Sequence, residues 1–373
     1  MLVGDFLGYL DRLAPFSLAL DWDNSGLQVG DPKAKAQKVA LALDPTNRVI
    51  DQAIERRADL LITHHPLIFK PSKSLNLQNP LTSPIFKAIK GELSIISAHT
   101  NWDKVGVAQA LAERLELIPD GPLELDSEEL AKLTVFAPAE GLDSIKQALF
   151  QVGVGRQGNY VETAYALKGV GQFRPEPGSQ PYVGDIGELT KVDEIRLETI
   201  LPKSLIPAAT LALRSTHPYE EPAFDFTICQ RPEQGLGLLA HWPTPRDPLA
   251  FCVEKLGLNK ANLEPSSLDQ LRFAGPEPGP ISQVALLPGS GGDYLLSAQK
   301  AGAQILITGE MSHHHALLAE EANFCVLAAG HYETESPGLL RLGQELEKIT
   351  RRLGATIEYI YLSEHSPWRK PGR

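Results

Sequence analysis

Four short apolar runs in this chain end abruptly in histidine or acidic residues, and no other feature restricts its possible folds as strongly. The polar clusters are His64-His65, His99 to Asp103, Thr308-Gly309-Glu310 and His331 to Glu335. The run at residues 60–63 is continuous rather than alternating, which is typical of a parallel strand covered on both faces. Because ligands of open α/β sheets bind outside the carboxyl ends of the strands, we expect the four clusters to meet in one cleft.

A strand followed by a helix is predicted just before the first cluster. Residues 39–43 form an apolar run, Asp44 and Pro45 follow as helix-start signals, and apolar residues from Ile50 onward recur at helical spacing. The run at residues 95–98 adds a further strand. Strands that alternate with helices in this way indicate the α/β class.

The early part of the sequence is repeated near its other end. Residues 39–63 align without gaps on residues 284–308, with identical residues at several strand positions. A shifted register for the later strand pairs His99 with His331 and Asp103 with Glu335. We therefore expect two related α/β halves that together form one domain.

A segment of different texture separates the halves. The predicted organisation is a first half at residues 1–124, an insertion at 125–232, and a linker with the second half at 233–373, the proline-rich residues 241–280 being the linker. Strands are expected in the insertion at 133–136, 161–167, 194–199 and 224–229, with helices at 142–151 and 205–214. This order is the split βαβ pattern of a ferredoxin-like α+β domain.

The residue types in the clusters favour a metal site. Imidazole and carboxylate groups without thiolate suit Zn, Fe, Mn or Co, and a carboxylate can bridge two cations that lie ~3.5 to 4 Å apart. The clusters hold more such groups than one closed site needs. A site for two divalent cations is therefore expected, and the sequence leaves the choice among Zn, Fe and Mn open.

Several longer motifs resemble one protein family. The stretches L-I-T-H-H-P-L-I-F, S-A-H-T-N-W-D, T-G-E and G-H-Y-E-T-E resemble the GTP cyclohydrolase I type 2 homologues, also called the Ngg-one interacting factor three family. The inserted segment, with H-P-Y-E-E-P at residues 217–222, resembles the CutA- or PII-like domain of the longer bacterial members. The resemblance covers essentially the whole chain.

The resemblance implies a ligand set and an assembly. Carried over to this sequence, the family pattern implies that two divalent metal ions per subunit are held by His64, His65, Asp103, His331 and Glu335. Glu335 is the expected bridge, with Asp103 also able to bridge. The resemblance further implies a toroidal homohexamer whose sites face an internal cavity, with the PII-like insertion as a gate or cap.

The expected activity is metal-dependent hydrolysis. A metal lowers the pKa of bound water from 15.7 to ~7, so water is the expected nucleophile and no side chain is assigned as catalytic. For a cyclohydrolase, as the family name implies, water would attack the guanine imidazole carbon and formate would leave. His99 and Glu310 are expected to orient ligands by hydrogen bonds, the alternative being that they are ordinary polar residues at strand ends. The alternative is a non-catalytic metal-binding or metal-trafficking protein regulated by its PII-like domain.

Other motifs have both a functional and a structural interpretation. His313-His314-His315 can be metal ligands or the polar first turn of a helix, and Ser290-Gly291-Gly292 can hold a phosphate or form a turn. Binding and turn formation are both open for His217, Tyr219 and Glu220 in the insertion, and for Asp23, Asn24 and Gly26 near the cleft.

Composition and charge restrict the partners and the compartment. The 373 residues exceed the ~250 to 300 at which single cores stop growing, which favours two structural units. The formal net charge of -11 disfavours nucleic acid, although a small nucleotide substrate stays possible at a cation site. Three cysteines, an odd number, indicate buried free thiols in a reducing compartment, and without an apparent leader or membrane span the expected location is the cytoplasm.

Overall fold

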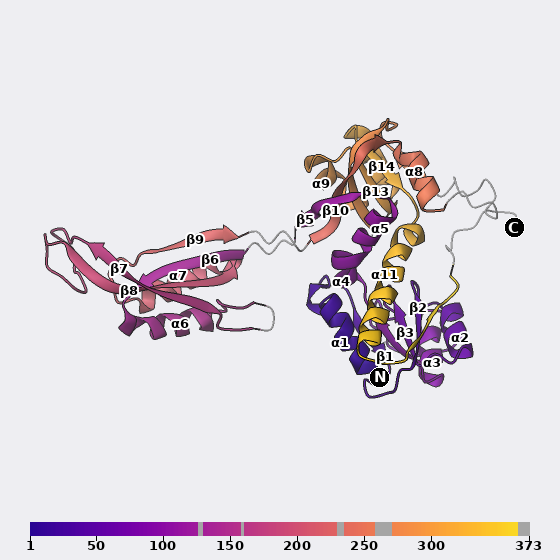
Figure 1. Cartoon of the computed structure of the whole chain (residues 1–373), viewed down its shortest axis with the longest axis horizontal. Helices are drawn as coiled ribbons and strands as arrows, with labels where there is room; N and C mark the ends of the chain where they lie inside the picture. Colours follow the sequence, from indigo (N-terminus) through magenta and orange to yellow (C-terminus); the bar gives the residue numbers. More distant parts are fainter. Residues whose placement is uncertain (126–129, 158–159, 230–234, 258–270, 365–373) are drawn as a thin grey trace. The chain divides into compact units, whose positions relative to one another are not determined.

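The chain folds into two compact units, each described here by itself (Figure 1). The computed structural model describes residues 1–125, 130–157, 160–229, 235–257 and 271–364. The outer unit comprises residues 1–125 and 233–373, and the inserted unit comprises residues 126–232. Several sheets and their covering helices make the protein mixed α/β.

The first sheet of the outer unit has five strands. Their order is β1 (Gly26–Val29), β4 (Ser94–Ser97), β3 (Leu60–Thr63), β2 (Lys38–Ala42) and β15 (Glu358–Tyr361). All neighbours are parallel except β1, which is antiparallel to β4. Helix α1 (Val3–Leu13) contributes to the core on one face, and α2 (Asn47–Glu55) and α3 (Ser83–Lys90) contribute to the core on the other. The continuous apolar sequence of β3 is explained by this cover on both faces, because all four of its residues are buried.

The second sheet has six strands and the same central plan. Their order is β11 (Arg272–Ala274), β14 (Cys325–Ala328), β13 (Ile305–Glu310), β12 (Ile281–Ser290), β10 (Gly235–Arg246) and β5 (Ile118–Leu125). Strands β12, β13 and β14 are parallel, as are β2, β3 and β4. Its helices are α8 (Pro248–Lys255) on one face, with α9 (Leu295–Lys300) and α10 (His313–Glu321) on the other.

The two sheets share their strand register. Val39 pairs with Leu60 and Val284 pairs with Ile305, which are the positions matched by the alignment of residues 39–63 on residues 284–308. The third strands follow the same register up to Ser97 and Ala328, which pair with Thr63 and Thr308. Counting on from these pairs places His99 opposite Gly330. The expected equivalence of His99 with His331 is therefore wrong by one residue, because the strand ladder rather than the polar cluster sets the register.

Helices are exchanged between the two sheets. After β4 the chain forms α4 (Thr100–Trp102), the π-helical turn η2 (Asp103–Val107) and α5 (Ala108–Arg114), and after β14 it forms α11 (His331–Arg352). Leu111 of α5 packs with Leu286 in the core of the second sheet, whereas Leu346 of α11 packs with Val39 in the core of the first. Figure 1 shows α5 beside α11, which contacts it. The exchange brings the polar ends of both halves to one place.

Trp102 and Gly338 mark the closest approach of the crossing segments. The indole nitrogen of Trp102 donates a hydrogen bond of 3.0 Å to the Gly338 carbonyl oxygen. A Cβ atom on Gly338 would lie 2.8 Å from the side chain of Val107, so only glycine fits against η2. This contact fixes Asp103, the first residue of η2, relative to α11.

The expected linker at residues 241–280 is wrong for much of its length. Residues up to 246 continue β10, residues 248–255 form α8 and residues 272–274 form β11, while 258–270 lie outside the described residues. Pro243 and Pro245 are exposed where the pairing of β10 with β12 is irregular, a position at which proline costs no ladder hydrogen bond.

The inserted unit has one antiparallel sheet. Its strand order is β7 (Ala164–Phe173), β8 (Thr190–Pro202), β6 (Leu130–Ala137) and β9 (Phe224–Cys229). Helices α6 (Leu142–Gln151) and α7 (Ile206–Thr216) form one core with it, in which Leu149 and Leu213 pack with Leu133 and Leu197. The order along the chain is βαββαβ.

The three cysteines are free thiols. Cys252 and Cys325 are free and buried, and Cys229 is free and partly buried. Within the described ranges, no helix combines the length and the apolar character that crossing a bilayer requires.

Candidate metal centre

Two adjacent histidines begin the site at the end of β3. The His64 and His65 N–H groups donate to carbonyl oxygens at and just after the end of β2, at 3.3 and 2.9 Å, so both residues continue the sheet register. The hydroxyl groups of Thr63 and Ser97 donate to the His65 carbonyl oxygen at 2.7 and 3.2 Å. The backbone of both histidines is thereby fixed at the carboxyl edge of the sheet.

The other three candidate ligands come from the exchanged segments. Asp103 begins η2, and His331 begins α11. Glu335 follows His331 by four residues and therefore lies on the same face of the helix, with the two side chains 3.1 Å apart. Glu335 is 4% exposed, so its carboxylate lies inside the protein.

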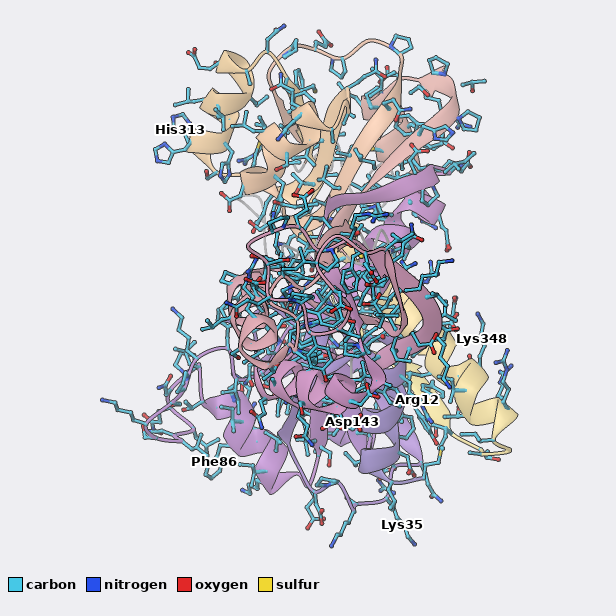
Figure 2. All side chains as sticks on the ribbon, turned by 90° about the vertical axis from the view of Figure 1, so that its left-hand side faces the viewer. Arg12, Lys35, Phe86, Asp143, His313 and Lys348 are labelled. Atoms are coloured by element: carbon cyan, nitrogen blue, oxygen red, sulfur yellow. The ribbon has the colours of Figure 1, made fainter. Side chains whose placement is uncertain are left out.

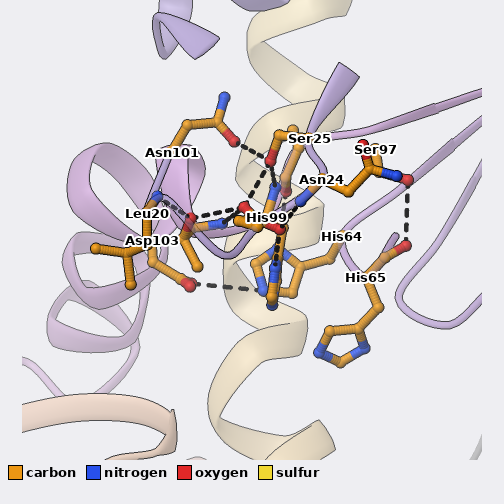
Figure 3. Close-up of polar contacts among 12 residues, drawn as sticks. Leu20, Asn24, Ser25, His64, His65, Ser97, His99, Asn101 and Asp103 are labelled. Atoms are coloured by element: carbon orange, nitrogen blue, oxygen red, sulfur yellow. Dashed lines mark hydrogen bonds and ion pairs between the residues drawn. The ribbon is translucent and has the colours of Figure 1, made fainter. Parts of the chain in front are cut away.

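The structure brings all five predicted ligands together. His64 Nε2 lies 3.4 Å from Asp103 Oδ1, drawn as a dashed line in Figure 3, and 3.9 Å from Glu335 Oε1. His65 Nε2 lies 3.3 Å from Glu335 Oε2, and His331 Nε2 lies 3.1 Å from Glu335 Oε1. Glu335 is therefore the common neighbour of the three imidazoles.

Each imidazole of the centre makes a hydrogen bond through Nδ1 to an oxygen atom on the side away from the other imidazoles. The acceptors lie at 2.8 to 3.1 Å and are Ala98 O for His64, Asp44 Oδ1 for His65, Asp23 Oδ1 for His99 and Glu310 Oε1 for His331. A carbonyl or an ionised carboxylate oxygen only accepts, so Nδ1 carries the proton. In the neutral ring Nε2 then presents its lone pair inward, which is how proteins orient imidazoles toward metals.

His99 lies beside the two histidines of β3. Its ring centroid is 5.2 Å from that of His64 and 5.4 Å from that of His65, and one nitrogen of each ring lies within 4.8 Å of the others. The sequence predicts an orienting role for His99, yet this geometry also allows it to be a ligand. Glu310 stands at the rim, where it accepts from His331.

Asp23 anchors His99 through a dense set of hydrogen bonds. It accepts from the Ser25 hydroxyl at 2.8 Å and from the Thr100 hydroxyl and N–H at 2.6 and 3.1 Å, besides His99. Burial alone would raise the pKa of Asp23, but the hydrogen bonds from His99 and Thr100 outweigh it and hold that pKa well below its usual range. Asp23 is therefore a fixed anion at the back of His99.

Two buried polar atoms at the centre have no hydrogen bond among the described residues. They are His64 Nε2 and Glu335 Oε2. Burial lowers the pKa of His64 to about 3, so its ring is neutral and Nε2 is a free lone pair. Buried polar atoms without hydrogen bonds are rare in native proteins and point to an ion or a water as the missing partner.

The imidazoles and carboxylates of the centre shift one another's pKa values. Burial would lower the pKa values of His65 and His331. The neighbouring carboxylates, Asp44 and Glu335 for His65 and chiefly Glu335 for His331, outweigh it and raise these pKa values to about 10 and about 9. Burial and the neighbouring Glu335 raise the pKa of Asp103. Burial also acts to raise the pKa of Glu335, but His331, His64 and His65 lower it. A divalent cation would compete with protons for the nitrogen and oxygen atoms of these side chains.

Two glycines of the second sheet leave room for the first turns of α11. A Cβ atom on Gly289 would meet the Glu335 carboxylate, and one on Gly309 would lie 2.8 Å from the His331 Cα. Gly289 also has a φ of +68°, which L-amino acids with side chains rarely adopt. Gly289 and Gly309 therefore have a packing role at the centre.

Asp44 is an orienting residue that the sequence interpretation assigned only to a helix start. It follows the apolar run of β2 directly, so the same strand-end pattern that marks His64 could have identified it. A cavity of about 300 Å³ lies next to it, lined by Asp44, Pro45, Thr46, Asn47, Leu67, Pro80, Leu81 and Pro84. The cavity offers space for part of a small molecule beside the centre.

The remaining histidine motifs have contacts of their own. His313 and His314 are exposed on α10, and Figure 2 shows His313 pointing outward. His315 Nε2 lies 3.0 Å from Asp293 Oδ1. In the inserted unit His217 Nε2 donates to the Phe136 carbonyl oxygen at 2.9 Å, while Nδ1 accepts from the Tyr219 N–H.

Comparison with protein families gives a match over nearly the whole chain. The model of the DUF34/NIF3 (NGG1p interacting factor 3) family matches residues 1–367. The chain is 33% identical over 365 residues to a Listeria innocua protein named GTP cyclohydrolase 1 type 2 homolog, covering 95% of each chain. It is 35% identical over 330 residues to a Bacillus subtilis protein of the same name, covering 86% of each.

Solved structures of similar proteins cover the chain equally well. A Bacillus cereus protein related to NIF3 is 29% identical with a TM-score of 0.67, and a Staphylococcus aureus protein is 27% identical with a TM-score of 0.72. Each comparison covers 99% of both chains. The similarity therefore includes the outer unit and the inserted unit.

Proposed function

The chain belongs to the DUF34/NIF3 (NGG1p interacting factor 3) family, and from this premise we propose that it binds two divalent cations and hydrolyses a nucleotide or related ring compound. Relatives of this chain carry the name GTP cyclohydrolase 1 type 2 homolog, which motivates the choice of ring hydrolysis. The alternative is a metal-binding or metal-trafficking protein without turnover.

One observation carries the metal proposal: inward-facing imidazoles meet two carboxylates at distances that suit shared cations. Two donor atoms that bind the same cation, each at about 2.1 Å, lie about 3.4 Å apart in a tetrahedral arrangement. His64 Nε2 and Asp103 Oδ1 are 3.4 Å apart, and Glu335 lies 3.1 to 3.9 Å from three imidazole nitrogens. His64 Nε2 and Glu335 Oε2 are buried without a hydrogen bond from any described residue, which supports the same conclusion.

The donor set divides naturally between two cations. His64 and Asp103 would hold one cation, and His65 and His331 would hold the other. Glu335 would bridge them, because its Oε1 lies 3.9 Å from His64 Nε2 of the first pair and its Oε2 lies 3.3 Å from His65 Nε2 of the second. Nitrogen and oxygen donors without thiolate suit Zn, Fe or Mn.

The remaining chemistry belongs to the residues around the pair. When bound, divalent cations lower the pKa of water and polarise an electrophile, which is the requirement for hydrolysis near neutral pH. Three carboxylates orient imidazoles by accepting a hydrogen bond from Nδ1: Asp44 from His65, Asp23 from His99 and Glu310 from His331. His99, held by the Asp23 anion, can exchange a proton with a substrate at Nε2.

The family resemblance motivates three further proposals about the whole protein. The βαββαβ order supports assigning the inserted unit to the ferredoxin-like, CutA- or PII-like class, and we propose that it gates the centre. We also propose a homohexamer. Three free cysteines support a location in the cytoplasm.

The test combines metal analysis with a formate-release assay on GTP. Freshly purified protein should contain two divalent cations per chain and release formate, and Glu335→Gln should contain less than one cation and release none. The matched control is Glu345→Gln in the same helix, where the carboxylate pairs with Lys348 at 2.7 Å, and this variant should behave as wild type. Full activity in metal-free protein would refute the hydrolase proposal, and cations without turnover would favour the trafficking alternative.

A further inference from the structure

Two large aromatic side chains are exposed beside the centre. Trp22 is 57% exposed and Phe69 is 51% exposed, and their ring centroids are 5.8 Å apart. The Trp22 ring also meets the His99 ring edge to face at 5.8 Å. Since His99 in turn adjoins His64 and His65, the aromatic pair extends the ring cluster of the centre outward.

Polar contacts, rather than burial of the rings, hold this pair in position. The Asn24 side-chain amide donates to the Ile68 carbonyl oxygen at 2.6 Å and to Gln28 Oε1 at 3.1 Å. Gln28 Oε1 also accepts from the Ile68 N–H at 3.2 Å, and the Gln28 amide donates to the Asn24 carbonyl oxygen at 2.6 Å. The segment that carries Trp22 is thus tied to the segment that carries Phe69.

The position of Trp22 relative to the imidazoles is fixed as well. Its neighbour Asp23 accepts from His99 Nδ1 at 2.8 Å, and the Leu20 N–H donates to the Thr100 hydroxyl at 2.9 Å. A single exposed apolar residue is ordinary on a protein surface. Two exposed rings in contact, anchored on both sides and next to a polar centre, instead match the composition of a small-molecule site.

We propose that Trp22 and Phe69 bind the planar heteroaromatic ring of the molecule that reacts at the centre. This inference rests on the proposed function and specifies the class of substrate. Aromatic side chains bind any base through its π-face, and such stacking contributes about 5- to 150-fold to affinity.

The test measures ring binding without turnover. Guanosine, adenosine, cytidine and neopterin are titrated by calorimetry into wild type and into Trp22→Leu and Phe69→Leu. Each variant should bind the preferred ring about tenfold more weakly, with unchanged metal content, and Trp22→Phe should keep most of the affinity. The matched control is Phe273→Leu, because Phe273 is 44% exposed on the edge strand β11 of the other sheet.

Failure of this inference differs from failure of the hydrolase proposal. Unchanged ring affinity in Trp22→Leu and Phe69→Leu would overturn the inference even if formate is released. Weaker binding in Leu81→Ala alone would move the ring to the neighbouring cavity and overturn it too. Absence of binding to all four rings by wild type has the same consequence. Ring binding through Trp22 in a protein without turnover would support the inference and contradict the hydrolase proposal.

Discussion

The carboxyl end of the first sheet carries imidazoles, whereas the equivalent end of the second sheet carries glycine. Both ends follow parallel strands with the same register. The equivalent pairs are Asp44 and Gly289, His64 and Gly309, and His65 and Glu310. One half therefore places ligands at its strand ends, and the other leaves space there for the ligands of α11.

This difference explains how one plan used twice yields one centre. If both strand ends carried imidazoles, the first turns of α11 would have no room, because a Cβ atom on Gly309 already crowds His331. If both carried glycine, no donor would face Glu335 from β3. The division of roles is a property of single residues, and substitution can therefore test it.

The largest effect is expected when His64 is replaced by glycine, the residue at the equivalent position of the second half. His64→Gly removes a donor whose Nε2 faces Asp103 and Glu335, so we expect cation affinity to fall about 100-fold or more. Calorimetric titration of metal-free protein with Zn or Mn measures the change. His315→Gly is the control, because it removes an imidazole that contacts Asp293 instead. Equal affinities in the two variants would contradict the account.

A smaller effect is expected when a side chain is added at Gly289, where the second half leaves space for Glu335. Gly289→Ala places a Cβ atom against the Glu335 carboxylate, so metal content should fall by at least half. Gly302→Ala is matched in backbone strain, since Gly289 has a φ of +68° and Gly302 of +86°, but nothing lies within 4 Å of its Cβ. If both variants lost metal equally, strain rather than crowding would be the cause.

A loss of cation affinity smaller than that of His64→Gly is expected from removing the acceptors that orient the imidazoles. Asp44→Ala frees His65, and Glu310→Ala frees His331, so each should weaken cation binding about 10- to 100-fold. The two losses should be similar, because each half supplies one carboxylate. Asp293→Ala, which frees His315 outside the centre, should leave binding unchanged. A loss in only one of the first two variants would break the symmetry.

The smallest effect concerns thiols in the core of the second sheet. Burial raises the pKa of Cys252 to about 12 and of Cys325 to about 11, so the reactive thiolate is scarce between pH 7 and 9. A thiol reagent should label only Cys229 in native protein, and all three cysteines after denaturation. Mass spectrometry locates the label. Rapid labelling of Cys325 in the native state would show that this core opens.

Local sequence patterns predicted the strands that carry the centre. The runs at residues 39–43, 60–63 and 95–98 correspond to β2, β3 and β4 within one residue. Their continuous apolar sequence reflects burial on both faces, which is a local signal. The ligand clusters follow at the strand ends, and the structure brings together the five ligands that the family resemblance implied.

Tertiary features lie beyond those patterns. The exchange of α5 and α11 between the sheets depends on packing between distant segments, so no local spacing reveals it. Pro243 and Pro245 suggested a linker because proline usually ends strands, yet an irregular pairing accommodates them in β10. The one-residue error at His99 has a similar origin, since only the ladder fixes the register.

Anomalous diffraction from crystals of freshly purified protein is the most direct test of the two-cation centre. Data collected at the absorption edge of the metal found by elemental analysis should show two peaks about 3.5 to 4 Å apart. One peak should lie against His64 and Asp103, the other against His65 and His331, with Glu335 reaching both. Peaks that lie only against other residues, or a single peak that Glu335 does not reach, would contradict the account.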